Sequence, residues 1–142
     1  MDLKKLSDQY RDELLNNVLP FWLQNSQDKE FGGYFTCLDR EGKVFDTDKF
    51  IWLQGREVWM FSMLYNKVEK RQEWLDCAVQ GGEFLKKYGH DRNYNWYFSL
   101  DRSGRPLVEP YNIFSYTFAT MAFGQLSLAT GNQEYADIAR KT

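Results

Sequence analysis

A six-residue segment that occurs twice, 62 positions apart, constrains the fold of this 142-residue chain more than any other feature. Residues 38–43 read LDREGK and residues 100–105 read LDRSGR, and each copy follows aromatic residues. An Asp-Arg-x-Gly sequence between apolar residues predicts a β-hairpin turn in which the glycine takes a positive φ. Two copies in matching contexts predict an internal repeat. The position of four side chains in the repeated turns predicts that they serve the turns: Asp39, Arg40, Asp101 and Arg102.

Helical hydrophobic spacing of two kinds flanks the two predicted hairpins. Residues 3–22 and 74–88 each carry one apolar stripe between charged residues, which predicts amphipathic helices with one buried face. Residues 51–68 and 113–129 are apolar almost all round, which predicts helices buried on most sides. The repeating unit is therefore an outer helix, a hairpin and an inner helix. Residues 133–142 begin a third outer helix.

This order of elements predicts an all-α fold, a toroid of helix hairpins with about two and a fraction units and two short β-hairpins. Residues 1–142 contain no linker or low-complexity tract, so they form part of a single domain. An inner helix in such a fold is buried only when neighbours cover both of its flanks. We therefore expect the chain to be a piece of a longer protein or a truncated product, or alternatively to be covered in a tight oligomer such as a homodimer.

Composition excludes several functional classes. The net charge of −2 and the pI of about 5.4 argue against a nucleic-acid partner. No run approaches the ~20 apolar residues that a membrane span needs, and two cysteines form no disulfide framework, so a cytoplasmic protein is expected. No cluster has metal-ligand spacing, and no carboxylate pair suggests glycosidase chemistry. Gly81-Gly82 lies within a helical pattern and predicts close helix packing rather than a phosphate loop.

The segment Trp52-Leu53-Gln54-Gly55-Arg56 opens the first predicted inner helix and is the strongest candidate for a functional site. A guanidinium is rarely buried without a partner. Arg56 either forms a structural ion pair, with Glu57, Glu83 or Glu109, or binds sugar oxygens or a developing oxyanion. Trp52 lies one turn earlier on the same face, as core or as pocket wall. His90, the only histidine, follows a helix end and is expected to be a surface residue.

Several motifs together resemble the N-acylglucosamine 2-epimerase family, which includes the renin-binding-protein type and, more distantly, cellobiose 2-epimerases and aldose-ketose isomerases. The motifs run in one order along nearly the whole chain: FGGYFTCLDREG from residue 31, WLQGREVW from residue 52, GGEFL from residue 81 and IFS from residue 113. The resemblance implies an (α/α)6 barrel, of which this chain is the N-terminal third.

The resemblance also implies a reaction. Such enzymes open a reducing sugar, remove the C2 proton and return a proton to the other face, with two histidines as acid and base. It implies that Arg56 is catalytic, beside the enediolate oxygen. It further implies a sugar as the small-molecule partner. Some members respond to ATP, but no segment of this sequence forms a recognisable nucleotide site, so no cofactor is expected. The residues implied to bind substrate are Trp52, Gln54, Phe114, Ser115 and Tyr116.

Two departures from the family pattern matter. The family's catalytic histidines correspond to positions beyond Thr142, and His90 matches neither, so the isolated chain is expected to be inactive. Tyr116 stands where an acidic residue is expected in the acylglucosamine enzymes, which opens the possibility of a neutral hexose substrate. The alternatives are an aldose-ketose sugar isomerase of the same superfamily and a non-catalytic helical-repeat module that binds a protein.

Overall fold

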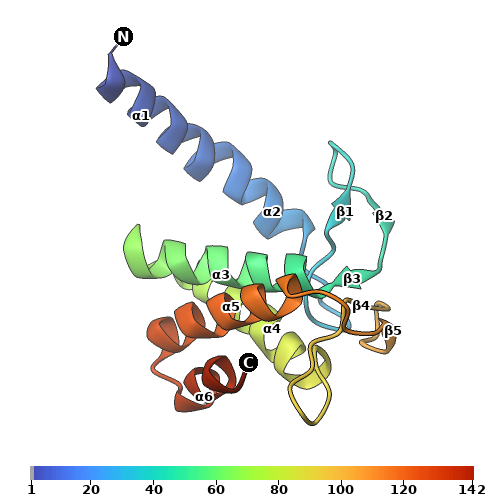
Figure 1. Ribbon diagram of the computed structural model, residues 1–142. Coiled ribbons are helices and arrows are strands. Elements are labelled where there is room, and N and C mark those ends of the chain that lie inside the picture. Colours follow the sequence, from blue (N-terminus) through green and yellow to red (C-terminus); the bar gives the residue numbers. More distant parts are fainter. Residues whose placement is uncertain (1) are drawn as a thin grey trace.

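The N-terminal helical segment projects from the body of the protein, and its C-terminal end lies beside the first hairpin (Figure 1). The computed structural model describes residues 2–142. Helix α1 (Leu3–Glu13) begins at Asp2, whose side chain accepts hydrogen bonds from the first turn, a normal N-cap. It continues through one π-helical turn, η1 (Leu14–Val18), into α2 (Leu19–Asn25). The predicted helix over residues 3–22 is therefore present, with a widened turn in its middle.

The buried stripe predicted for this helix is wrong for its first half. Helix α1 has no buried residue, and Leu3 and Tyr10 are 68% and 70% exposed. Burial begins only at Leu19, where α2 reaches the rest of the protein. The apolar spacing is real, but within residues 2–142 no element packs over that part of the stripe.

Both predicted hairpins are present. Strand β1 (Cys37–Leu38) pairs with β2 (Val44–Asp46), and β4 (Ser99–Leu100) pairs with β5 (Pro106–Val108), all antiparallel. Gly42 and Gly104 have φ of 85° and 95°, and the carboxylates of Asp39 and Asp101 accept backbone hydrogen bonds within the turns. Strand β3 (Lys49–Phe50) was not predicted; it pairs with β4 and links the two units in a three-stranded sheet.

Four helices form the body. Helices α3 (Ile51–Lys67), α4 (Gln72–Tyr88), α5 (Phe114–Thr130) and α6 (Gln133–Lys141) agree closely with the predicted ranges. Helix α3 packs against both α4 and α5, and α6 packs against α5 (Figure 1). Gly81 and Gly82 allow close packing as predicted, because a Cβ at either would overlap Tyr34 or Leu126. None of the helices in residues 2–142 is long and apolar enough to span a membrane.

Helix α5 is buried on fewer sides than predicted. One of its faces packs on α3, but four apolar residues at the start of the helix or on its opposite face remain exposed: Ile113, Phe114, Met121 and Leu128. Helix α3 fulfils the prediction better, since eight of its residues are buried. Helix α5 also contacts α4 and α6, but these contacts leave exposed the face that carries Met121 and Leu128.

A buried ion cluster fastens the hairpins to the loop after α2. Lys49 has no exposed surface, and its Nζ donates to Asp28 Oδ2 at 3.0 Å and to the carbonyl oxygens of Gly32 and Arg102. Arg102 also donates to both oxygens of Asp28, at 2.9 and 3.1 Å. Arg102 therefore does more than serve its turn. The cluster sets the position of β3, and with it the start of α3.

Candidate functional site

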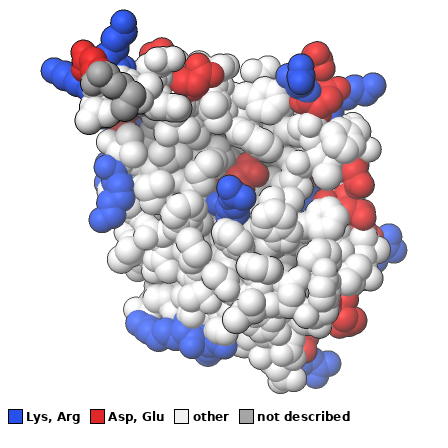
Figure 2. Space-filling view, turned by 45° about the horizontal axis from the view of Figure 1, so that its top comes forward, with Lys and Arg blue, Asp and Glu red and all other residues white. Residues whose placement is uncertain are grey.

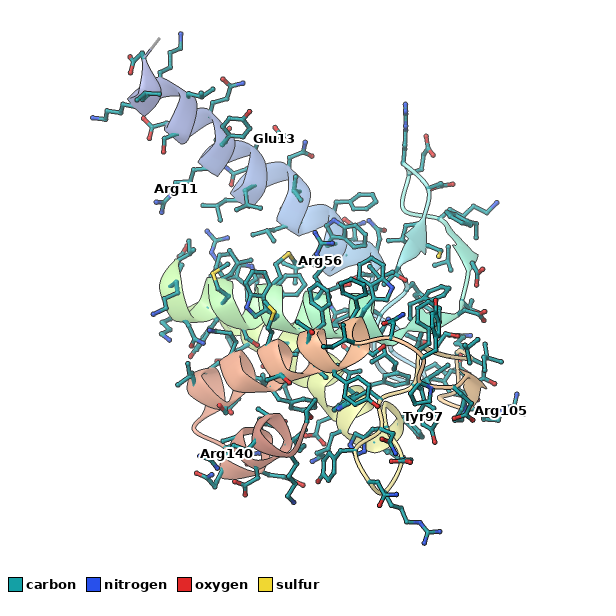
Figure 3. The ribbon with its side chains drawn as sticks, in the orientation of Figure 1. Arg11, Glu13, Arg56, Tyr97, Arg105 and Arg140 are labelled. Carbon is teal, nitrogen blue, oxygen red and sulfur yellow. The ribbon has the colours of Figure 1, made fainter. Side chains whose placement is uncertain are left out.

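A cleft of about 400 Å³ lies along α3 where the end of α2 and the first hairpin approach it. Figure 3 shows Arg56 on the side of α3 that faces α2. Residues 53, 56, 57 and 60 recur at intervals of three and four, so they share one face of α3. The lining combines apolar walls with three polar groups: Trp22, Thr36, Leu53, Arg56, Glu57, Trp59 and Met60.

Arg56 is exposed to the cleft and has no ion-pair partner. Within residues 2–142, no carboxylate lies within 4.0 Å of its guanidinium. Glu83 instead pairs with Lys86 and accepts from the Tyr135 hydroxyl. The structural ion pair considered for Arg56 is therefore wrong. In Figure 2, a basic and an acidic group lie side by side in a hollow of an otherwise largely uncharged central surface.

Glu57 is the second polar group of the cleft. It is only 8% exposed, and its Oε1 lies 2.6 Å from Ser26 Oγ at the end of α2. Burial raises the pKa of the Glu57 carboxyl to about 8. Thr36 supplies a third group, because its Oγ1 is buried and lacks a hydrogen-bond partner among the described residues. A buried hydroxyl without a partner is costly, so a ligand oxygen at this position would satisfy it.

Gln54 does not line this cleft, so its assignment as a substrate-binding residue stays a prediction that rests on the family resemblance. Its side chain is fully buried, its Oε1 accepts from the Tyr34 backbone N–H at 2.8 Å, and its Nε2 donates to the Tyr34 carbonyl at 2.9 Å. Both ends of the amide are thus used by the backbone of the segment before β1. Gln54 therefore holds that segment against α3 from a fully buried position.

The other predicted substrate-binding residues lie outside this cleft. Trp52 is half-buried and packs against Phe118 of α5, with ring centroids 6.0 Å apart. At the start of α5, Ser115 is buried, Phe114 is exposed, and Tyr116 lines a separate shallow surface depression. The structure therefore brings only Arg56 of the predicted set to the cleft. The remaining assignments stay predictions that rest on the family resemblance.

His90 lies away from the cleft, in the loop after α4. Its Nδ1 is 2.7 Å from the Asp91 carbonyl oxygen, and its ring stacks on Tyr94 with centroids 4.5 Å apart. The ring is half-buried, whereas the sequence predicts a surface residue. His90 therefore packs against Tyr94, and it does not line the cleft that contains Arg56.

Sequence reasoning missed the remaining members of the cleft. Glu57 was considered only as an ion-pair partner for Arg56, although its position next to Arg56 on an inner helix was a signal for the same cavity. Thr36 and Trp22 come from other elements, and no local pattern joins them to α3. Together, an exposed cation, a buried carboxyl, a free hydroxyl and two indoles suit a hydroxylated ligand whose C–H faces can lie against aromatic rings.

Comparisons with known proteins agree with this description. The sequence profile of the N-acylglucosamine 2-epimerase (GlcNAc 2-epimerase) family matches residues 33–142. The chain is 45% identical over 128 residues to an N-acylglucosamine 2-epimerase of Mus musculus, which covers 87% of this chain and 30% of the relative. It is 46% identical over 125 residues to the Homo sapiens enzyme of that name, covering 85% of this chain and 29% of the relative. The chain thus spans about a third of the length of the relatives it matches.

Solved structures show the same fold. The cellobiose 2-epimerase of Bacillus thermoamylovorans B4167 superposes with a TM-score of 0.88 at 28% identity, covering 97% of this chain and 36% of that one. A D-mannose isomerase superposes with a TM-score of 0.76 at 22% identity, covering 87% of this chain and 31% of that one, and this match concerns the fold alone. The prediction of helix hairpins from an (α/α)6 toroid is therefore confirmed.

Proposed function

Because this chain belongs to the N-acylglucosamine 2-epimerase family, we propose that its cleft forms part of the site of a sugar 2-epimerase, in which Arg56 binds the oxygen that becomes negative during the reaction. The observation that carries the proposal is an exposed guanidinium without an ion-pair partner among residues 2–142, in an aromatic cleft of a chain 45% identical to such an enzyme. The proposed substrate is an N-acylglucosamine or a related reducing sugar.

The chemistry explains why a cation is needed. Removing the C2 proton of an open-chain sugar moves negative charge onto the neighbouring carbonyl oxygen and gives an enediolate. A positive group that is already in place stabilises this charge without reorganising at the moment of reaction. Apolar walls strengthen the effect, because they lower the effective dielectric around the charge. Leu53, Trp59 and Met60 supply such walls around Arg56.

We further propose that the 142-residue chain binds the sugar but does not epimerise it. Epimerisation by proton transfer needs a base on one face of C2 and an acid on the other. His90 is the only histidine of the chain, and it lies in a different part of the structure from Arg56. The alternative, an aldose-ketose isomerase, uses the same enediolate and differs in where the proton returns.

A chimera tests the proposal for Arg56. Residues 1–142 replace the matching segment of the Mus musculus N-acylglucosamine 2-epimerase, and exchange of the C2 proton of N-acetylmannosamine is followed by NMR in D2O. Arg56→Ala is expected to lower kcat roughly 10²–10³-fold, the usual cost of removing one charge-stabilising group. Arg40→Ala, which removes an exposed arginine from the first hairpin, is expected to leave the rate unchanged.

Normal exchange in Arg56→Ala would remove Arg56 from the chemistry. Turnover by the 142-residue chain alone would refute the proposal that it lacks the proton-transfer groups. The same spectra separate the two reactions, because an epimerase yields the C2 epimer of the aldose and an isomerase yields a ketose.

A further inference from the structure

The hydroxyl of Ser26 touches two oxygen atoms at short range. Its Oγ lies 2.7 Å from the Trp22 carbonyl oxygen and 2.6 Å from Glu57 Oε1. Separations of this size between oxygens indicate O–H···O hydrogen bonds. Each of the two contacts therefore needs a proton between its oxygens.

Ser26 can supply only one of these protons, since a hydroxyl carries a single hydrogen and two lone pairs. The Trp22 carbonyl cannot donate, so its contact must use the Ser26 proton. The carbonyl can accept this proton together with the Ser26 backbone N–H at 2.9 Å, because it has two lone pairs. The proton of the second contact must then come from the Glu57 carboxyl, which donates to Ser26 Oγ.

We propose that Glu57 keeps its carboxyl proton at neutral pH and acts in the cleft as an uncharged hydrogen-bonding group, which leaves the positive charge of Arg56 free for the ligand. With Oε1 bonded to Ser26, Oε2 is left as an acceptor for a ligand hydroxyl in the cleft that Glu57 lines. The hydroxyl of Thr36, which has no partner among the described residues, is the neighbouring donor. The part of this inference that concerns the sugar rests on the proposed function, whereas the protonation does not.

The surroundings of Glu57 favour the neutral form. The carboxyl is almost fully buried, and burial opposes ionisation. Arg56 is the nearest charged group on its own helix, yet no ion pair within 4.0 Å joins the two side chains. Behind Glu57 lie Tyr34 and Cys77, and burial raises the pKa of both, so they carry no charge at neutral pH. Among the described residues, α2 faces Glu57 with the neutral Ser26 and Trp22.

An ionised Glu57 would have a different consequence. A carboxylate in the same cleft would attract the guanidinium of Arg56 and would repel a second negative charge on the ligand. Arg56 would then stabilise an enediolate less. A neutral carboxyl keeps the hydrogen-bonding atoms and removes the repulsion. Glutamine reproduces this neutral form, since its Nε2 can donate to Ser26 while its Oε1 accepts from the ligand.

The test titrates the 142-residue chain labelled with ¹³C at the glutamate carboxyls. The Glu57 signal is the one absent from the spectrum of Glu57→Gln, and Glu41→Gln, at an exposed position, should leave that signal in place. The expected titration midpoint of Glu57 is near pH 8, well above the usual range of glutamate carboxyls. A midpoint in the ordinary glutamate range would overturn the inference, whatever the chain's activity.

Ligand binding tests the role of the neutral group. N-acetylmannosamine is titrated into the wild-type chain and its variants, with tryptophan fluorescence as the readout. At pH 7, Glu57→Gln is expected to bind within about twofold of wild type, and Glu57→Leu about tenfold more weakly, the worth of one good hydrogen bond. Above pH 8, wild type is expected to lose affinity while Glu57→Gln does not.

The outcomes distinguish the protonation of Glu57 from the proposed sugar-binding function. A large loss of affinity in Glu57→Gln at pH 7 would show that the ligand needs a carboxylate, and it would overturn the inference. If no variant binds the sugar while the carboxyl still titrates near pH 8, the proposed function fails and the protonation of Glu57 stands.

Discussion

The ammonium group of Lys49 has no access to solvent, so its charge is stabilised by oxygen atoms of Asp28, Gly32 and Arg102 and by the ring of Phe84, whose centroid lies 4.4 Å away. Asp28 is the single carboxylate among them. Burial alone would raise the pKa of Asp28, but the hydrogen bonds from Arg102 and Lys49 outweigh it and lower the pKa to about 2. At this scale, stability depends on whether one buried cation keeps its counter-ion.

Asp28→Asn is therefore expected to lower the free energy of unfolding by about 3 kcal/mol, because it leaves Lys49 buried without a negative charge. Urea denaturation monitored by circular dichroism measures the loss. Glu30→Gln is the matched control, since Glu30 contacts the same Arg102 from an exposed position and should change stability by less than about 1 kcal/mol. Equal losses of stability in Asp28→Asn and Glu30→Gln would contradict the idea that burial makes the Lys49–Asp28 pair important.

The same carboxyl predicts how stability depends on pH. Its folded pKa lies below the unfolded value of 3.8, so the folded state releases the Asp28 proton more readily. The contribution of about 2 kcal/mol is complete above pH 4, falls as the pH drops from 3.8 towards 2, and is absent below. Asp28→Asn should lack this step in the acid unfolding profile.

Helix α4 illustrates what decides packing at the scale of an element. Its two adjacent glycines face different neighbours: a Cβ at Gly81 would overlap the Tyr34 phenol, and a Cβ at Gly82 would overlap one methyl group of Leu126. The Tyr34 hydroxyl is held by a hydrogen bond to the Cys77 carbonyl at 2.7 Å. The phenol therefore cannot move as easily as the end of a leucine side chain.

Gly81→Ala is expected to destabilise the chain by about 1–3 kcal/mol, the usual cost of overpacking, and Gly82→Ala by less. Gly124→Ala on α5 is the control, because a Cβ there meets nothing within 4 Å. That substitution should raise stability by up to ~1 kcal/mol, since alanine favours a helix over glycine. Thermal unfolding measures the stability of the three variants. If Gly81→Ala were as stable as Gly124→Ala, the close contact between Gly81 and Tyr34 would not limit stability.

As a whole, the molecule exposes apolar side chains on two separate helices. Helix α1 exposes Leu3 and Tyr10, and α5 exposes Phe114 and Leu128. In a closed toroid each unit covers its neighbour, and within residues 2–142 these two faces have no neighbour.

Two leucines of α5 allow a buried and an exposed position on one helix to be compared. Leu128 is 71% exposed and Leu126 is fully buried, although only one residue separates them. Leu126→Ala is expected to cost about 2–5 kcal/mol, and Leu128→Ala about 0.5 kcal/mol or less. Leu128→Gln should also lower the binding of a hydrophobic dye to the chain. A large loss of stability in Leu128→Ala would show that this face is covered in solution.

The sequence predicted the parts of the molecule that depend on local spacing. Turn residues Asp39 and Asp101, the two hairpins and the helices all follow from periodicity and turn chemistry, which act over a few residues. The pairing of Gln54 with the Tyr34 backbone was not predicted, because the two lie 20 residues apart in the sequence. The exposure of α1 and the pairing of Arg102 with Asp28 were missed for the same reason: they depend on how distant segments meet.

The ion cluster also has a consequence for the order of folding. Lys49 belongs to the first unit, but one carbonyl and the second cation of its cluster come from residue 102, in the second hairpin. Contacts of such sequence separation form late, because a long loop must close first. Limited proteolysis of chains that end at residue 95 and at residue 112 should show the segment around Asp28 protected only in the longer one. During synthesis, the first repeat would thus remain incomplete until the second hairpin had been made.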